Sequence, residues 1–387
     1  MKKALLLVTG LVLIGIVLFF SIMPMRIEAS LNTVVPHQPY AISDAAQILH
    51  DSLFVADLHA DSLLWQRDLL QRSATGHADL PRLQAGNVSL QVFSAVTKSP
   101  SGLNDLENAS DSDDITSLAI VQRWPVATWS SLYERAAYQL EKLQAFSSAS
   151  NGALQLILSQ GDLRALLAAR DSGSNTVGAI YLIEGAHPLE GELANLDRLF
   201  DDGLRIVAFT HFFDNELGGS LHGVSKAGLT DFGRQVVARA DQLEMVIDVA
   251  HASPQAVRDI LALASRPVIL SHGGLQGACD TPRNLSDELM QQITAAGGLV
   301  GIGYWASAVC DVSPAGIVKS MRYAVDLLGV DHVALGSDYD GTVKVPFDTT
   351  ELAILTQTML EHGFSDTEIR KIMGGNVQRF LLEWLPE

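Results

Sequence analysis

Eight short apolar or β-branched segments recur between residues 54 and 341, and most are followed by a stretch with helical spacing of Ala, Val, Leu and Ile. Strand-like segments that alternate with helices are typical of parallel βαβ units, and nearly continuous apolar strands are buried on both faces. Eight such units predict an α/β fold, the (β/α)8 TIM-like barrel. The segments are FVADLHA, VSLQVFSAV, AIYLIEGA, LRIVAFTH, MVIDVAHA, PVILSHGG, GLVGIGYW and HVALGSDYDG.

A doubly wound open sheet is the alternative arrangement of the same units. Its nucleotide-binding members carry a glycine-rich turn, G-x-G-x-x-G or G-x-x-x-x-G-K-[ST], after the first strand. Neither turn follows the first segment of this chain. The sequence therefore favours the barrel.

The composition suits one large domain. The chain has 387 residues, of which 48% are hydrophobic and 18% charged, which is enough apolar material for a sizeable core. We expect a single barrel domain over residues 31–387. The formal net charge of -18, with no block of Lys and Arg to offset it, repels phosphate backbones and argues against nucleic acid as a partner.

The connection between the second and third strands, residues 97–178, is unusually long. It begins with a polar, turn-rich stretch and continues with the helical segments ITSLAIVQRW and WSSLYERAAYQLEKLQAF. Because it leaves the end of a strand, we interpret it either as a lid over the barrel mouth or as a solvated loop. The sequence leaves both interpretations open.

Residues 1–30 are predicted to be an export segment. Two lysines precede a stretch without charged residues from Ala4 to Met25. A stretch of about 20 apolar residues crosses a bilayer as a helix, whereas the apolar region of a cleavable signal has roughly 7 to 15 residues. We favour an uncleaved transmembrane anchor, and cleavage after Ala29, which would give a secreted protein, is the alternative. In both cases the lysines stay in the cytoplasm and the domain is exported to the periplasmic or extracellular side.

Candidate metal ligands stand at the ends of six of the eight strand segments. In a barrel, side chains at the C-terminal ends of the strands converge on one mouth. Buried polar groups there need partners, and a metal centre satisfies several of them at once. Imidazoles and carboxylates without cysteine suit Zn²⁺ or a similar divalent ion. In chain order the candidates are His59, Asp61, Glu184, His211, His251, His272, Asp338 and Asp340.

The first pair, His59 and Asp61, is two residues apart in one strand, so both side chains are expected to face the barrel axis. With Glu184, His251 and His272 they make five ligand candidates. This number exceeds the three or four protein ligands that a single catalytic zinc takes. We therefore predict two ions that share one carboxylate.

The remaining histidines and Asp57 are interpreted as structural. Asp57 precedes the first ligand pair, and a structural carboxylate is favoured over a role in orienting a ligand. The histidines lie in loops, in helices or at strand beginnings. They are His37, His50, His77, His187, His222, His332 and His362.

The ordered motifs of the chain resemble those of the membrane dipeptidase (renal dipeptidase) family, the M19 metallopeptidases, from about Phe54 to Phe380. The resemblance implies a zinc-dependent dipeptidase that acts on dipeptides with a free C-terminal carboxylate, and a homodimer is common in that family. The motifs are DLHADS, LIEGAHPL, LRIVAFTH, GLTDFGRQVVARADQLEMVIDVAHAS, VILSHGG, PRNLSDELM, GSDYDG and GGNVQRF.

The resemblance also implies the distribution of the metal ligands. His59 and Asp61 would bind the first zinc, His251 and His272 would bind the second, and Glu184 would bridge both. The chain departs from the family pattern at positions 58 and 60, where Leu and Ala replace Gly and Asn, and in the following SLLW. These departures leave the ligands intact and bear on the shape of the substrate pocket.

Three further roles follow from the resemblance. Asp338 would transfer protons, His211 would contact the carbonyl oxygen of the substrate, and Arg283 would bind its terminal carboxylate. The two cysteines, Cys279 and Cys310, suit an exported protein, in which a disulfide persists, and two buried free thiols are the alternative. They fall close to the position of a family disulfide, which favours the bond.

The expected mechanism is attack by a hydroxide that bridges the two ions, because a pair of divalent ions lowers the pKa of a shared water toward neutrality. His211 and one ion would stabilise the charge on the carbonyl oxygen, while Asp338 carries the proton to the leaving amine. Two other functions remain open. One is a metal-dependent hydrolase of another amide, lactone or ester bond, and the other is a membrane-anchored binding protein without catalysis.

Overall fold

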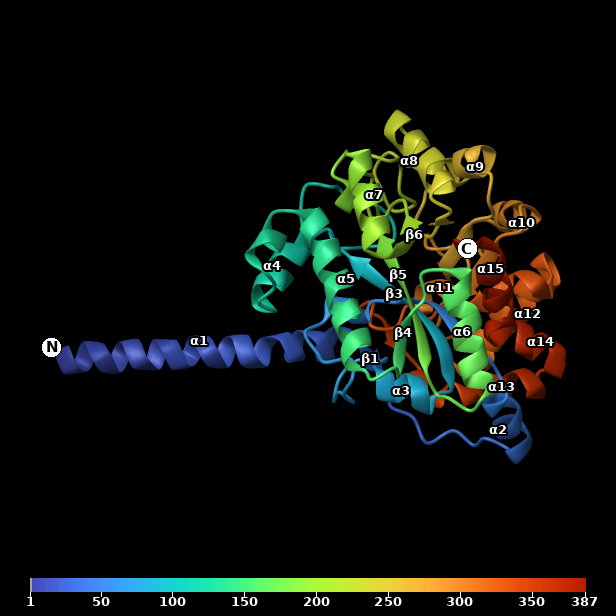
Figure 1. The fold of residues 1–387 in the computed structure, drawn as a ribbon, viewed down its shortest axis with the longest axis horizontal. Coiled ribbons are helices and arrows are strands. Elements are labelled where there is room, and N and C mark those ends of the chain that lie inside the picture. Colours follow the sequence, from blue (N-terminus) through green and yellow to red (C-terminus); the bar gives the residue numbers. More distant parts are fainter. Residues whose placement is uncertain (1) are drawn as a thin grey trace.

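The computed structural model describes residues 2–387 and has the predicted closed barrel of eight parallel strands (Figure 1). The strand order is β3-β2-β10-β9-β8-β7-β6-β5, and β3 pairs with β5 to close the ring. Each predicted strand segment contains or overlaps one of these strands, so the predicted fold is confirmed. They are β2 (Val55–Ala60), β3 (Val88–Val96), β5 (Val177–Glu184), β6 (Leu204–Ala208), β7 (Val246–Asp248), β8 (Ile269–Gly273), β9 (Leu299–Ile302) and β10 (Val333–Leu335).

Helices surround the strands and bury one apolar face each. In α12, for example, Ile317, Met321, Ala324 and Leu328 are buried at a spacing of three to four residues, as expected for one face of a helix. The outer helices are α2 (Asp44–Asp51), α3 (Leu80–Ala85), α7 (Leu193–Asp202), α8 (Asp231–Gln242), α9 (Pro254–Leu263), α10 (Asp287–Ala295), α11 (Ala306–Val309), α12 (Pro314–Leu328), α13 (Ala353–Glu361), α14 (Asp366–Arg370) and α15 (Asn376–Trp384).

The long connection after β3 contains α4 (Asp114–Val121), the 3-10 turn η2 (Val126–Trp129), α5 (Leu132–Ala149), the short strand β4 (Leu154–Leu156) and α6 (Gln160–Asp171). Strand β4 pairs with β5 at the edge of the barrel and is absent from the sequence-based expectation. Helix α5 ties the connection to the loop after β2, because the half-buried Lys142 ammonium donates to the carbonyl oxygens of Leu63 and Trp65, both at 2.7 Å.

The C-terminal segment SDTEIRKIMGGNVQRFLLEW has helical spacing throughout but does not form one continuous helix. A π turn over Lys371–Gly375 separates α14 from α15. The reason is a close approach of two backbones: a Cβ on Gly374 would lie 2.0 Å from the carbonyl oxygen of Phe54. The turn brings Gly374 against the entry to β2, and α15 then packs on β2, β9 and β10.

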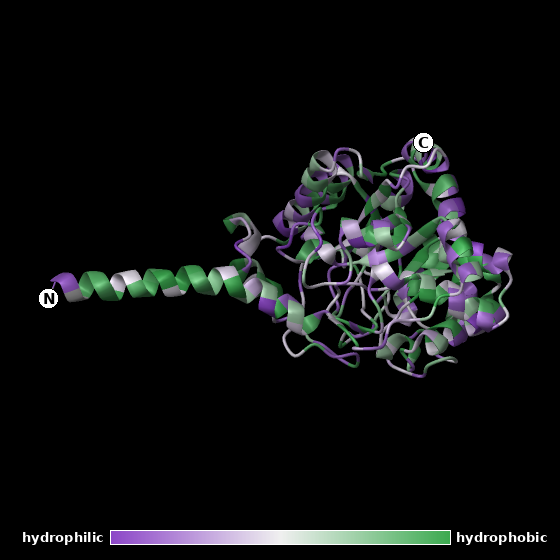
Figure 2. Cartoon of the chain, turned by 90° about the horizontal axis from the view of Figure 1, so that it is seen from below, coloured by the Kyte–Doolittle hydropathy of each residue, from purple (hydrophilic) through white to green (hydrophobic). Residues whose placement is uncertain are grey.

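Helix α1 (Lys2–Leu31) projects away from the barrel, and Figure 2 shows that most of its length is hydrophobic. It is long and apolar enough to be a membrane anchor or a signal sequence. At its end the chain joins the barrel through a two-stranded sheet, in which β1 (Thr33–Val34) pairs with β11 (Lys344–Val345). The end of α1 therefore lies next to the loop that follows β10.

Candidate metal centre

The carboxyl ends of the strands enclose a cavity of about 310 Å³. Glu184, His251 and His272 line it from the barrel strands and the loops that follow them, and Arg283 and Asp338 line it from loops. Leu103, Asn104 and Asp105 of the long connection after β3 also line it. The cavity therefore combines ligand-type side chains with the volume for a small substrate.

Glu184 is the central residue of the cavity. Its Oε1 atom lies 3.5 Å from Nε2 of His59, 3.2 Å from Nε2 of His251 and 3.3 Å from Nε2 of His272. Its Oε2 atom lies 3.4 Å from Nε2 of His211. Glu184 is the last residue of β5, so the end of one strand brings its carboxylate within reach of imidazoles from four other parts of the barrel.

His59 and Asp61 meet as the sequence predicts, although not through simple strand alternation. The register between β2 and β3 shifts after Asp57, and Asp61 lies one residue beyond the end of β2, where the turn η1 (Ser62–Leu64) begins. Oδ1 of Asp61 nevertheless lies 3.5 Å from Nε2 of His59. Both atoms are buried without a hydrogen-bond partner.

This arrangement fits divalent metal ions. Buried polar atoms without partners are costly, and a cation placed among the Nε2 and carboxylate oxygen atoms satisfies them together. Nε2 of His251 and Nε2 of His272 face each other at 3.0 Å. The ligand atoms of Glu184, His211 and His251, and those of His59, Asp61 and Glu184, lie within 4.8 Å of one another in each group.

The protonation states of His251 and His272 are those of metal ligands, whereas that of His59 is set by its two carboxylate neighbours. Burial lowers the pKa of His251 and of His272 well below the ordinary value, and the Arg283 guanidinium contributes to both shifts. These imidazoles are therefore neutral, which is the ligand form of histidine. Burial opposes a charge on His59 as well, but Glu184 and Asp61 outweigh it and raise the pKa of His59 well above its usual range.

Asp248 and Ser271 orient two of the imidazoles, and sequence reasoning missed both. The Ser271 hydroxyl lies 2.9 Å from Nδ1 of His272 and 3.3 Å from Nδ1 of His59, and it lies 2.5 Å from Oδ2 of Asp248. Partners of this kind fix the orientation of metal-binding histidines. The available signal was the charged Asp248 inside the apolar segment MVIDVAHA.

Asp338 lies in the loop after β10, beside the metal-ligand cluster. Its backbone has a φ of 57°, in the left-handed region, where Asp is tolerated better than most residues. Burial, together with the negative charges of Asp61 and Glu184, raises the pKa of Asp338 well above that of an ordinary carboxyl. A carboxyl group with a raised pKa beside the cluster is suited to holding and releasing a proton.

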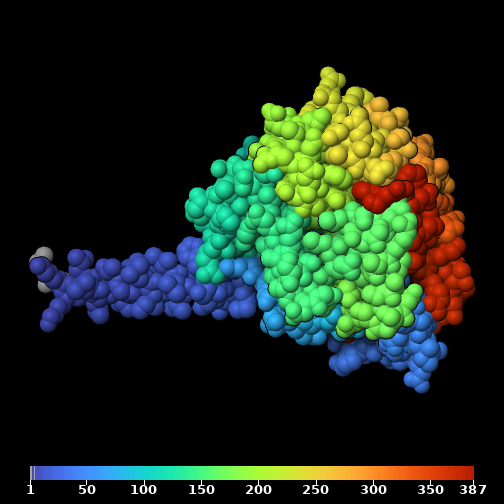
Figure 3. Space-filling model, in the orientation of Figure 1, coloured from blue at the N-terminus to red at the C-terminus, as the bar shows by residue number. Residues whose placement is uncertain are grey.

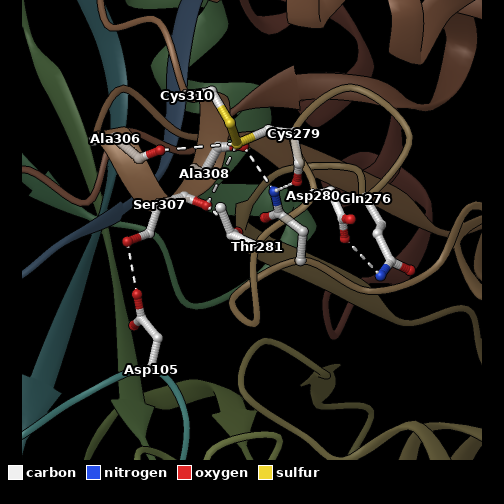
Figure 4. The surroundings of a disulfide bond; sticks show 10 residues. Asp105, Gln276, Cys279, Asp280, Thr281, Ala306, Ser307, Ala308 and Cys310 are labelled. Atoms are coloured by element: carbon white, nitrogen blue, oxygen red, sulfur yellow. Dashed lines mark hydrogen bonds between the residues drawn. A yellow bond between two sulfur atoms is a disulfide. The ribbon is translucent and has the colours of Figure 1, made fainter.

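Arg283 is a buried cation at the cavity wall. Its Nη2 donates to the carbonyl oxygen of His272 at 2.9 Å and lies 3.3 Å from Nε2 of His251. The segment that carries it is fastened by a disulfide between Cys279 and Cys310 (Figure 4). The side chain of Asn284 strengthens this fastening, because it donates to the carbonyl oxygens of Cys279 and Ala308, both at 2.9 Å.

The structure separates Asp340 from the other candidates. Its carboxylate forms an ion pair with Arg67 and accepts from the backbone N–H of His77 at 2.6 Å. Asp57 is likewise structural: it accepts from the backbone N–H of His59 at 3.0 Å and from both the backbone N–H and the hydroxyl of Ser337 at 3.0 Å. These two carboxylates hold the ends of β2 and β10 in place.

His222 lies closer to the site than the sequence suggested. Its ring lies 5.2 Å from that of His251, centroid to centroid, and its Nδ1 lies 2.7 Å from the carbonyl oxygen of Asp105. Burial and the positive charge of Arg283 lower the pKa of His222 to about 4. A neutral His222 thus connects the long connection after β3 to the wall of the metal centre.

A parallel barrel with imidazoles, carboxylates and one arginine at its C-terminal mouth fits a metal-dependent hydrolase. Residues 43–384 match the membrane dipeptidase family (peptidase family M19). Because the match covers most of the chain, the protein belongs to this family, and it is a metallo-dipeptidase.

Two curated proteins resemble the chain at low sequence identity. The chain is 29% identical over 259 residues to an uncharacterised protein in the pqqA 5′ region of Klebsiella pneumoniae, a match that covers 63% of this chain and 93% of that protein. It is 26% identical over 215 residues to the dipeptidase verJ of Clonostachys rogersoniana. This second match covers 54% of this chain and 55% of that protein.

Solved structures share the fold. A metallopeptidase from Rhodobacter sphaeroides, bound to a phosphinate mimic of the dipeptide L-Ala-D-Ala, superposes with a TM-score of 0.71 at 23% identity, over 86% of this chain and 99% of that one. The probable dipeptidase PvdM from Pseudomonas aeruginosa superposes with a TM-score of 0.72 at 20% identity, over 88% and 98% of the two chains.

Proposed function

We propose that the protein hydrolyses the peptide bond of dipeptides that carry a free C-terminal carboxylate, and that it uses two Zn²⁺ ions per chain. The observation that carries this proposal is the position of Glu184, whose Oε1 lies within 3.5 Å of the Nε2 atoms of His59 in β2, His272 in β8 and His251 in the loop after β7. His59 and Asp61 would hold one ion, His251 and His272 the other, and Glu184 both. Ligand atoms of nitrogen and oxygen without sulfur suit zinc.

Ions bound there would polarise the peptide carbonyl and lower the pKa of a water molecule toward neutrality. His211 reaches Glu184 from the loop after β6 and would donate to the carbonyl oxygen as charge develops on it. Asp338, whose carboxyl has a raised pKa, would accept the proton of the attacking water and deliver it to the leaving amine.

Arg283 would select the substrate by its end group. A guanidinium binds a carboxylate through two parallel hydrogen bonds, and this geometry fixes the distance from the carboxylate to the scissile bond. An internal peptide bond of a longer chain offers no such carboxylate. The cavity volume of about 310 Å³ is in the range of small-molecule sites, and the related Rhodobacter structure holds a mimic of a dipeptide.

We also propose that α1 remains attached as a membrane anchor, with Lys2 and Lys3 in the cytoplasm and the catalytic domain exported. Three residues at a spacing of four, Pro24, Glu28 and Asn32, are buried against the rest of the chain. Nε of Arg67 lies 2.7 Å from Oε1 of Glu28. Cleavage after Ala29 would remove this ion pair, which supports retention of the helix.

A substrate panel with the full-length chain in detergent tests the proposal. Dipeptides, N-acyl amino acids and lactones are assayed before and after chelation, and again after addition of Zn²⁺. We expect hydrolysis of dipeptides that disappears on chelation and returns with zinc. Preferential hydrolysis of the acyl amino acids or lactones would favour the other hydrolase function, and a lack of hydrolysis in zinc would favour a binding protein.

A further inference from the structure

The last third of α1 lies against the barrel domain rather than free of it. Phe20 is half-buried, and Pro24, Glu28 and Asn32 continue the same helical face as buried residues. Ile27 packs against the apolar cluster that contains Trp65 and Trp124. Because several contacts hold this part of α1, the direction in which the helix leaves the domain is fixed.

Beside this part of α1 lies an apolar surface of the long connection after β3, which we call the α4–η2 shelf and define by Ile120, Val126 and Trp129. Their exposed fractions are 36%, 69% and 39%. Helix α4 contacts α1, and Figure 3 shows these segments side by side at the point where α1 leaves the domain. Exposed apolar surfaces of this kind commonly mark an interaction site.

The shelf and α1 enclose one hollow of about 450 Å³. Ile16, Val17, Phe20 and Ser21 line it from α1, and Ile120, Arg123, Trp124 and Trp129 line it from the shelf side. The hollow is therefore apolar on both sides, with a single arginine at its wall.

The position of the hollow along α1 sets how deep the hollow lies in the bilayer. A helix rises 1.5 Å per residue, so the hydrocarbon core of a bilayer, about 30 Å thick, takes about 20 residues. Counted from Leu5, the start of the apolar span, this length ends near Pro24. Residues Ile16–Ser21 thus lie in the outer half of the span, and so do Ile120 and Trp129, the shelf residues that line the hollow with them.

We propose that Ile120, Val126 and Trp129 insert among the phospholipid acyl chains of the outer leaflet. The inference rests on the proposed retention of α1. Tryptophan is enriched at the membrane interface, and an arginine such as Arg123 extends its charged end toward the headgroups. The domain then contacts the bilayer at two places, the span and the shelf.

A second contact fixes the orientation of the barrel and keeps its mouth near the bilayer surface. The backbone N–H of Thr342 donates to Oδ1 of Asn32 at 2.8 Å, and Thr342 lines the mouth cavity. The end of α1 and the substrate entrance thus share one loop. Dipeptide substrates would enter close to the membrane surface.

Single thiol labels in the full-length chain test this proposal. Cys279 and Cys310 are bonded to each other, so an introduced cysteine is the accessible thiol. Three variants are labelled with an environment-sensitive fluorophore and placed in nanodiscs of phosphatidylcholine and phosphatidylglycerol with nitroxide-bearing acyl chains. Val126→Cys reports the shelf, Leu13→Cys reports the anchor, and Leu263→Cys on α9 is the matched control, because Leu263 is also an exposed aliphatic residue at 45%.

We expect the labels at 126 and 13 to lose most of their emission to the nitroxide lipids, and the label at 263 to keep it. If the label at 13 is quenched but the label at 126 emits as strongly as that at 263, the proposed insertion of the shelf is refuted, while the proposed membrane span of α1 stands. A lack of quenching at 13 would show that α1 does not span the bilayer and would overturn the proposal with it. Dipeptide hydrolysis measured in the same nanodiscs separates either result from failure of the proposed activity.

Discussion

Oε1 of Glu184 lies 3.2 Å from Nε2 of His251, although the strands that lead to these residues, β5 and β7, are separated by β6. The contact forms because both side chains leave the carboxyl ends of parallel strands and turn toward the axis. His251 has a φ of 62°, an uncommon backbone conformation for a residue other than glycine. The barrel thus holds the carboxylate and the imidazole within one cluster of side chains that could bind a metal ion.

Replacement of Glu184 tests the proposal that this carboxylate is a ligand of both metal ions. Glu184→Gln keeps the shape of the side chain and removes its negative charge, so both proposed ions lose a ligand. Residues that merely orient metal ligands cost about 10- to 100-fold when they are removed, and we therefore expect kcat/KM for dipeptides to fall by more than about 100-fold. Glu288→Gln, at an exposed position on α10, is the control and should retain activity. Equal activity of the two variants would refute the role of Glu184.

Arg283→Ala tests recognition of the substrate carboxylate. A hydrogen bond to a charged group contributes about 1.5 to 3 kcal/mol, which corresponds to roughly 10- to 100-fold. We expect KM to rise by that factor for a dipeptide and to change little for the corresponding dipeptide amide. Arg258→Ala, at an exposed position on α9, controls for loss of positive charge. An equal effect of Arg283→Ala on the acid and the amide would contradict the assignment.

His187 makes the fold sensitive to acid. Its ring packs at a tilt against that of Phe213, with 4.7 Å between centroids. Burial, assisted by the positive charges of His211 and Lys98, lowers its pKa to about 3. As the pH falls below about 6.5, His187 takes up a proton in the unfolded chain but not in the folded chain. The contribution of His187 to the free energy of unfolding is therefore complete above pH 6.5 and declines as the pH falls toward 3.

The variant His187→Phe should remove this pH dependence. From pH 6.5 to pH 5 the wild type should lose about 2 kcal/mol more in free energy of unfolding than the variant, because each pH unit corresponds to about 1.4 kcal/mol. Denaturant unfolding at several pH values measures the difference. A packing penalty in the variant is independent of pH and does not affect the comparison, whereas parallel pH profiles would disprove the prediction.

The disulfide should stabilise the fold and the position of Arg283. Cys279 and Cys310 are 31 residues apart, and closing a loop of this length stabilises the folded state by about 3 to 4 kcal/mol. We expect the double variant Cys279→Ser, Cys310→Ser to lose that free energy of unfolding and to show a higher KM for dipeptides. Wild-type protein treated with a reductant should behave like the variant. Unchanged stability after confirmed reduction would count against the prediction.

The barrel and much of the site were predictable because both follow from local patterns. Buried parallel strands are continuous apolar segments, and polar residues at their ends converge on one mouth. That rule brought Glu184, His251 and His272 together in advance, although it included Asp340, which binds Arg67 instead. No local pattern distinguishes Asp338 from Asp340, because both follow β10 in the same loop. Only the path of that loop places Asp338 at the cavity and Asp340 against Arg67.

Features that depend on contacts between distant segments were not predictable. The π turn at Gly374 exists because the backbone at Phe54 occupies the space of a side chain. Ser271 contacts two imidazoles directly, and its hydroxyl donates to Asp248, but a serine in a strand carries no signal of such a role. The proximity of His222 to His251 depends on the path of the loop after β6.

The metal content of the full-length chain tests the central claim most directly. Protein purified in detergent and freed of loosely bound ions is analysed by inductively coupled plasma mass spectrometry, with protein concentration from amino-acid analysis. If Glu184 binds two metal ions, wild-type protein should contain two zinc ions per chain. A ratio of one, or metal-free protein that hydrolyses dipeptides at the full rate, would contradict the account.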